Sequence, residues 1–298
     1  MDVRVLSIQS HVVRGYVGNK SATFPLQVLG FDVDAINSVH LSNHTGYEHI
    51  RGQVLNDEDL GTVIDGLFSN GLNDYSHLLT GYVGSPSFLN KIASVVKELK
   101  KFNPNMVYVC DPVMGDNGKM YVPESLLPIY RDTIIPLADI ITPNQYELEL
   151  LTGKQIKNVD DAWAAIDSFH DKGCKHVVVS SSELGDEKKL VAFASSIKGG
   201  KKTKVIVDIP KLNSNFTGTG DLFAALFLAW MHKTDNNLTK SLENTIGTLQ
   251  AVLKKTLSHA LELSKGSSPR PEHLELRLVQ SKNDIENPEP VVQCRIVA

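Results

Sequence analysis

Residues Phe216 to Asp221 read Phe-Thr-Gly-Thr-Gly-Asp and are followed by the apolar stretch LFAALFLAWMH. This stretch has no polar face, which predicts a helix buried in the core. Gly218 and Gly220 would let backbone N–H groups at the start of the helix approach a ligand closely. Free N–H groups and the helix dipole both favour a bound anion at that end. The motif therefore predicts a phosphate-binding helix start.

Asp221, in the first turn of this predicted helix, has two interpretations. The carboxylate could stabilise the helix dipole, which is worth about 0.3–1 kcal/mol. Beside a phosphate, however, it would repel the ligand unless its role is to accept a proton from an attacking hydroxyl group. A general base of this kind contributes roughly 10²–10⁴-fold in rate. We favour the base and keep the dipole interpretation open.

The chain alternates apolar runs with amphipathic stretches of helical length. This order predicts one α/β domain over residues 1–298, with a mostly parallel sheet flanked by helices on both faces. Two later runs without a helix between them predict an antiparallel edge, joined by a solvated hairpin loop at 198–204, and the alternating tail 274–280 predicts a last edge strand. The predicted strands are 3–8, 31–39, 77–81, 106–111, 138–142, 176–181, 190–195 and 204–209, and the helical stretches include 57–70, 86–101 and 158–173.

Polar residues follow each of the first six predicted strands. Ligands of open α/β sheets bind beyond the carboxyl ends of the strands, so these residues should share one edge. Each one alone has an ordinary explanation as a turn, a helix cap or a solvated loop. Their common position favours a site. The segments are Gln9–His11, Ser42–Tyr47, Gly81–Tyr82, Asp111–Asp116, Thr142–Glu147 and Ser180–Ser182.

Composition narrows the class of protein. The 298 residues include 30 basic and 34 acidic side chains, and a net charge of −4 argues against a basic nucleic-acid-binding surface. Three scattered cysteines predict no disulfide framework or zinc cluster. The polar start and the short apolar runs predict no signal peptide and no membrane span, so we expect a cytoplasmic protein. G-x-x-x-x-G-K-[ST] does not occur, which excludes a P-loop enzyme.

Five segments together resemble the pyridoxal kinase family, eukaryotic type, within the ribokinase-like superfamily. They are LSIQSHVVRGYVGN (6–19), SNHTGY (42–47), CDPVMGD (110–116), TPNQYELELLTG (142–153) and FTGTGDLFAA (216–225). The likeness extends from about residue 3 to residue 295. Gly-Thr-Gly-Asp alone indicates only the superfamily, whereas the first two segments point to the vitamin B6 branch. The resemblance implies a ribokinase-like fold, pyridoxal as the small-molecule substrate and ATP as the co-substrate.

The resemblance also implies a role for each site residue. Asp221 would deprotonate the 5′-hydroxymethyl group, while Gly218, Thr219 and Gly220 surround the phosphoryl group. The substrate-binding residues would be Ser10, Val17, His44, Thr45 and Tyr82. The ATP-binding residues would be Asp111, Asn144, Ser180, Ser181, Leu212, Asn213, Ser214 and Thr219. Asp116 and Glu147 would organise Mg²⁺, directly or through water, and Asp111, Thr142 and Ser180 would lie near a monovalent cation, K⁺ or Na⁺.

Members of this family are usually homodimers, so we expect a homodimer that binds neither nucleic acid nor membrane. Two other functions remain open at this point. A hydroxymethylpyrimidine kinase shares the phosphoryl-transfer motif. A non-catalytic B6-binding protein could keep the fold, although such a protein needs no base at a phosphate site.

Overall fold

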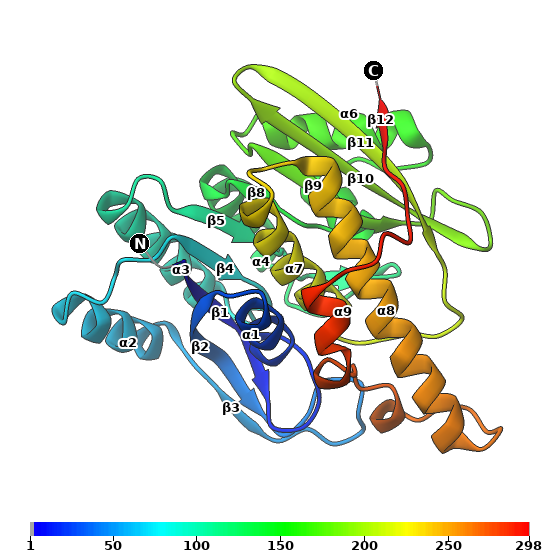
Figure 1. Ribbon diagram of the computed structural model, residues 1–298. Coiled ribbons are helices and arrows are strands. Elements are labelled where there is room, and N and C mark those ends of the chain that lie inside the picture. The colour runs from blue at the N-terminus through cyan, green and yellow to red at the C-terminus, as the bar shows by residue number, and fades with distance from the viewer. Residues whose placement is uncertain (1–2, 298) are drawn as a thin grey trace.

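Ten strands form one sheet within residues 3–297, the part of the chain that the computed structural model describes (Figure 1). Six adjacent strands, β9, β8, β5, β4, β1 and β2, pair with one another in parallel. The strands at the two margins, β12, β11 and β10 on one side and β3 on the other, pair antiparallel. The predicted α/β class with a mostly parallel sheet is confirmed. In spatial order the strands are β12 (Arg295–Val297), β11 (Lys201–Pro210), β10 (Lys189–Lys198), β9 (His176–Ser182), β8 (Ile140–Ile141), β5 (Val107–Cys110), β4 (His77–Thr80), β1 (Arg4–Val12), β2 (Asp32–Leu41) and β3 (Gly52–Val54).

Helices cover both faces of the sheet, and each face has its own apolar core. In Figure 1, the yellow α7 and the orange α8 run across one face. Across residues 3–297, no helix combines the length and the apolar character that crossing a membrane requires. The helices of the first core are α2 (Asp57–Ser69), α3 (Pro86–Phe102), α4 (Leu126–Ile129), α5 (Gln145–Thr152) and α6 (Val159–His170). Those of the second core are α1 (Asn19–Val28), α7 (Thr219–Lys233), α8 (Leu238–Ser264) and α9 (Lys282–Glu286).

The predicted helices correspond to α2, α3 and α6, and local sequence explains where they begin. The side chains of Asn56 and Asn158 accept hydrogen bonds from backbone N–H groups of the first turn in α2 and α6, and Ser85 does so in α3. Within residues 3–297, helix α7 begins without a side-chain cap and is held in place by burial of its apolar residues. Every residue from Leu222 to Met231 is buried, as its uniformly apolar sequence predicts.

The hairpin predicted at 198–204 is confirmed, but its loop is shorter than predicted. Gly199 and Gly200 turn the chain with positive φ angles, and residues 201–204 already belong to β11. The edge strand predicted at 274–280 is wrong. Leu276 and Leu278 are buried in the core on the α7 and α8 face, which produces the alternation without a partner strand. The chain then enters the 3₁₀ helix η4 (Val279–Ser281), and β12 occupies the sheet edge instead.

Candidate active site

The start of α7 is shaped by Gly218, which adopts a left-handed conformation with φ 84°. A Cβ atom at this position would overlap the carbonyl oxygen of Tyr16, so glycine is required by conformation and by close approach. No side chain caps the first turn of α7, a helix that lies wholly within the described residues. Its leading backbone N–H groups therefore keep the capacity to bind an anion.

Asp221 lies in that first turn, and its Oδ2 accepts a hydrogen bond from the backbone N–H of Gly18 at 2.7 Å. Burial raises the pKa of Asp221, and the bond from Gly18 partly opposes this shift. A desolvated carboxylate with a raised pKa is a better proton acceptor than an exposed one. Gly18 was not predicted as a site residue, because a backbone donor leaves no mark in the side-chain pattern.

The predicted substrate residues near the end of β1 lie close to this carboxylate. A Cβ atom at Gly18 would overlap Ser10, and the Cα of Val17 lies 3.3 Å from where a Cβ of Gly218 would stand. Both Ser10 and Val17 are buried. The structure therefore brings Ser10, Val17 and Asp221 together around one segment, the 15–18 loop. Tyr82, half-buried after β4, is tied to β2 because its carbonyl oxygen accepts from Ser38 Oγ at 3.0 Å.

The loop between β2 and β3, residues 42–47, faces the turn that precedes α7. A Cβ atom at Gly46 would lie 3.9 Å from Thr217 Oγ1, within ordinary contact distance. His44 is buried in this loop, whereas Thr45 is exposed. Thr45 thus adjoins in the chain the residue that contacts this turn.

Asp111, which directly follows β5, is a buried polar residue on the other side of the helix start. Its Oδ1 accepts from Thr142 Oγ1 at 3.1 Å, and its Oδ2 is buried without a hydrogen-bond partner among residues 3–297. A Cβ atom at Gly220 would lie 3.5 Å from that Oδ2. Burial raises the pKa of Asp111 well above its usual value, and the charges of Glu147 and Asp221 raise it further.

Glu147 is buried in the first turn of α5 and holds the neighbouring loop in place. Oε1 accepts from the backbone N–H groups of Met114 at 2.9 Å and Gly115 at 3.4 Å, and Oε2 accepts from that of Asn144 at 3.0 Å. Burial raises the pKa of Glu147 to about 7, although these three bonds oppose the shift. The carboxylate that was expected to organise Mg²⁺ thus already organises the backbone.

The remaining nucleotide-side residues differ in how firmly they are held. Asn144 caps α5 through a bond from the Glu147 N–H at 2.9 Å, and its Nδ2 donates to the Gly115 carbonyl at 2.8 Å. Ser180, at the end of β9, lies with its Oγ 3.5 Å from the Pro143 carbonyl oxygen. Asp116 is exposed on the small hairpin of β6 (Gly115–Asp116) and β7 (Lys119–Met120), and its carboxylate accepts two bonds from Asn117.

Five residues predicted to bind the nucleotide are placed by their position in the fold rather than by a contact with the carboxylates. Ser181 is half-buried within β9, and Thr219 is the first residue of α7. Leu212, Asn213 and Ser214 form the loop that leads from β11 toward α7, where the backbone N–H of Ser214 donates to the Leu212 carbonyl at 2.8 Å. This loop lies in the chain close to the turn at the start of α7.

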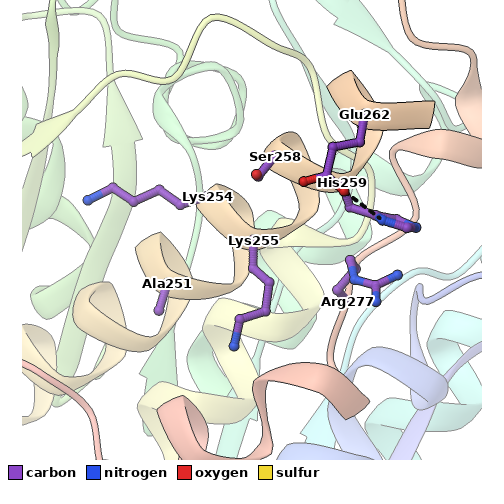
Figure 2. A pocket seen from close by; sticks show the side chains of 7 residues that line it. All are labelled: Ala251, Lys254, Lys255, Ser258, His259, Glu262 and Arg277. Atoms are coloured by element: carbon purple, nitrogen blue, oxygen red, sulfur yellow. Dashed lines mark ion pairs between the residues drawn. The ribbon is translucent and has the colours of Figure 1, made fainter. Parts of the chain in front are cut away.

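A separate hollow lies on α8 and contains none of these residues (Figure 2). Its basic groups are partly neutralised, because Lys255 Nζ lies 2.7 Å from Asp284 and His259 lies 4.0 Å from Glu262. The candidate site is therefore the edge around the start of α7. The hollow is lined by Ala251, Lys254, Lys255, Ser258, His259, Glu262 and Arg277.

Known proteins match the chain over nearly its whole length. A family model described as phosphomethylpyrimidine kinase matches residues 28–270. Pyridoxal kinase of Sus scrofa is 52% identical, with 99% of this chain and 96% of that protein covered. Pyridoxal kinase of Homo sapiens is 50% identical, with 99% of each chain covered.

A solved structure extends the likeness to three dimensions. Pyridoxal kinase from Leishmania donovani, in complex with ADP and pyridoxamine, matches with a TM-score of 0.92. Its sequence is 35% identical, and the match covers 100% of both chains. The fold, the helix start with its aspartate and the full-length relatives agree, and this chain belongs to the pyridoxal kinase family.

Proposed function

We propose that this protein is an ATP-dependent kinase that phosphorylates the 5′-hydroxymethyl group of pyridoxal and related B6 vitamers, giving pyridoxal 5′-phosphate. One observation carries the proposal. Asp221 lies at an uncapped helix start, and its carboxylate is held at 2.7 Å by the Gly18 N–H. The base and the anion-binding groups are thus close enough to act on one phosphoryl group. The full-length likeness to pyridoxal kinases supports the same substrate.

Asp221 acts as the general base. Its carboxylate takes the proton of the 5′-hydroxyl group as that oxygen attacks the γ-phosphorus of ATP. The bond from the γ-phosphorus to the β–γ bridging oxygen breaks, and ADP leaves with that electron pair. The N–H groups around Gly218, Thr219 and Gly220 stabilise the negative charge on the phosphoryl oxygens, because they are already oriented toward that position.

The two sides of the helix start bind the two substrates. Ser10 and Thr45 hydrogen-bond the pyridine ring, and Val17, His44 and Tyr82 enclose it. The nucleotide lies on the other side, beyond β5, β8 and β9. The residues proposed to hold it are Asp111, Asn144, Ser180, Ser181, Leu212, Asn213, Ser214 and Thr219.

The nucleotide side suits cations. Asp111 has a buried oxygen without a hydrogen-bond partner among residues 3–297, and its pKa is raised first by burial and then by the charges of Glu147 and Asp221. A cation would oppose this shift. No cluster of three His, Cys, Asp or Glu side chains at metal-binding spacing occurs within residues 3–297. This fits Mg²⁺, which usually binds one or two carboxylates together with substrate phosphates and water.

In this proposal Asp116 and Glu147 organise Mg²⁺, directly or through water, and Asp111, Thr142 and Ser180 lie near K⁺ or Na⁺. Bound Mg²⁺ neutralises charge on the phosphate oxygens during transfer. We expect activity to disappear in a chelator and to return with added Mg²⁺. We also expect K⁺ to stimulate turnover relative to choline at equal ionic strength. Full turnover in the chelator would contradict the role of Mg²⁺. Equal turnover in K⁺ and in choline would contradict the role of the monovalent cation.

A substrate panel tests the function directly. The purified protein is incubated with ATP and, in turn, pyridoxal, pyridoxine, pyridoxamine and hydroxymethylpyrimidine, and formation of ADP and of the phosphorylated product is measured. We expect phosphorylation of the B6 vitamers. Preference for hydroxymethylpyrimidine would support the alternative kinase, and tight pyridoxal binding without ADP formation would support a non-catalytic binding protein.

A further inference from the structure

Glu275 lies far from the reacting groups in sequence, yet its carboxylate contacts two loops of the site. The Tyr16 backbone N–H donates to Oε2 at 3.0 Å, and the Tyr47 hydroxyl donates to Oε1 at 2.8 Å. These partners are 259 and 228 residues away in the chain. The Glu275 side chain is only 14% exposed, so the bonds form in a largely desolvated environment. A charged acceptor in such a place binds strongly.

The same carboxylate also contacts His44 in the 42–47 loop. Nε2 of His44 lies 3.3 Å from Glu275 Oε1, and Nδ1 accepts a bond from the Gly46 backbone N–H at 3.0 Å. Because Nδ1 accepts, the ring proton resides on Nε2 and points to Glu275. The ring also packs on Tyr47, with 4.9 Å between ring centroids. Gly46 and Glu275 together therefore set the orientation and the tautomer of His44.

The 15–18 loop connects Glu275 to the reacting groups. Its Tyr16 peptide donates to Glu275 on one side, while the Tyr16 carbonyl oxygen packs directly against Gly218. Two residues further on, the Gly18 N–H donates to Asp221 at 2.7 Å. A displacement of this loop would thus reach both the phosphate-binding turn and the proposed base.

Charge and protonation support this arrangement. Burial alone would raise the pKa of Glu275, but the hydrogen bonds from His44 and Tyr47 hold it below its usual value. Burial, and then the bond to Glu275, raises the pKa of Tyr47. Near neutral pH, Glu275 is therefore a carboxylate and Tyr47 is a neutral donor.

We propose that Glu275 is a positioning residue of the pyridoxal pocket, which holds the 15–18 loop and the 42–47 loop against the start of α7. The part that concerns pyridoxal rests on the proposed function. Glu275 acts through His44, Tyr16 and Tyr47, and it takes no part in proton transfer. Its loss should weaken the vitamer site and leave the nucleotide side, which is built from other segments, unaffected.

The test compares Glu275→Gln with the matched control Glu272→Gln. Glutamine keeps the size but has only one acceptor oxygen for three donors. We expect the KM for pyridoxal to rise about tenfold, equivalent to about 1.4 kcal/mol, with a smaller change in kcat and an unchanged KM for ATP. The control removes a carboxylate that pairs with Arg270 at 2.9 Å, and it should behave like the wild type. Wild-type kinetics in Glu275→Gln would refute the positioning role.

Hydrogen exchange separates this proposal from the proposed function, since it needs no turnover. In Glu275→Gln the amides of Tyr16, Gly18 and Gly46 should exchange at least several-fold faster than in the wild type, while those of α5 stay unchanged. If the wild type does not phosphorylate pyridoxal but these amides respond, the function is wrong and the positioning role stands. Unchanged exchange at these amides would overturn the role. Tyr47→Phe removes only one hydrogen bond to Glu275, so it should increase the exchange rates less. This variant provides the test if Glu275→Gln does not fold.

Discussion

Two glutamates, the buried Glu147 and the half-buried Glu275, contact the two sides of the candidate site. Their partners lie at different distances along the chain. Glu147 accepts three backbone N–H groups, from Met114, Gly115 and Asn144, at most 33 residues away. Glu275 binds two loops that lie 228 and 259 residues away. The proposed nucleotide side is therefore assembled from strand ends and a helix cap in the middle of the chain, whereas the proposed pyridoxal side depends on the C-terminal tail.

The pKa values of the two carboxylates are shifted in opposite directions, and their surroundings explain why. Burial raises the pKa of Glu147 to about 7, and the nearby charge of Asp116 adds to the shift. Donors from His44 and Tyr47 instead lower the pKa of Glu275. A carboxylate with a raised pKa suits a place where a cation arrives, while one with a lowered pKa suits a permanent anchor. Substitutions on each side should separate these roles.

The largest effect is expected for Asp221→Asn, in the turn where both sides meet. Asparagine keeps the size of the side chain and can still accept the Gly18 N–H, but it cannot take up the proton. Turnover should fall by about 10²–10⁴-fold. ATP binding should persist, because the backbone N–H groups of α7 remain. Steady-state kinetics and an ATP titration measure the two quantities.

Asp59→Asn provides the control for the dipole interpretation. Asp59 lies in the first turn of α2 and belongs to its capping box, away from the proposed site. Its replacement should lower the free energy of unfolding by about 0.3–1 kcal/mol and leave kcat unchanged. If Asp221→Asn behaves in the same way, with near-normal turnover, Asp221 is a dipole partner and another group is the base.

Glu147→Ala should have the next largest effect, which is a loss of stability. Three backbone N–H groups would lose their acceptor, two of them in buried hydrogen bonds. Leaving a buried donor unsatisfied costs about 1–3 kcal/mol. We expect the free energy of unfolding to fall by about 2–4 kcal/mol, with weaker ATP binding as the loop around Met114 loosens. Chemical denaturation and ATP titration test both. Glu98 is exposed, so Glu98→Ala serves as the control and should change stability by less than about 0.5 kcal/mol. An equally small loss for Glu147→Ala would show that the hydrogen bonds of Glu147 do not hold the loop.

The difference between contacts of short and of long sequence separation also explains what could be predicted from the sequence. Asp111 and Thr142 were found because parallel strands end at one edge, and α7 was found because its residues are apolar all round. A strand end and an apolar helix can each be recognised from a short stretch of sequence. The partners of Glu147 were missed because the sequence shows a carboxylate but not which backbone groups it accepts from.

The pyridoxal side was harder to predict. The segment LELRLVQ alternates like a strand, so Glu275 was expected on a sheet edge, but the alternation reflects the burial of Leu276 and Leu278. A contact with Tyr16 across 259 residues has no local signal. The role of Gly18 depends on a backbone N–H, which every residue except proline carries. Long-range side-chain contacts of this kind need the folded chain.

The smallest effects are expected from Ser10→Ala and Thr45→Val, which remove single hydroxyl groups on the pyridoxal side. Each lost hydrogen bond should cost about 0.5–1.5 kcal/mol. The KM for pyridoxal should therefore rise by roughly 2- to 13-fold, with little change in kcat or in the KM for ATP. Thr62→Val, in the exposed face of α2, is the control for Thr45→Val and should leave the kinetics unchanged. A rise in the KM for ATP instead would place these hydroxyls on the nucleotide side and break the division between the two sides. Unchanged kinetics in both variants would remove Ser10 and Thr45 from the site, because a hydroxyl that binds the ring cannot be lost without weakening pyridoxal.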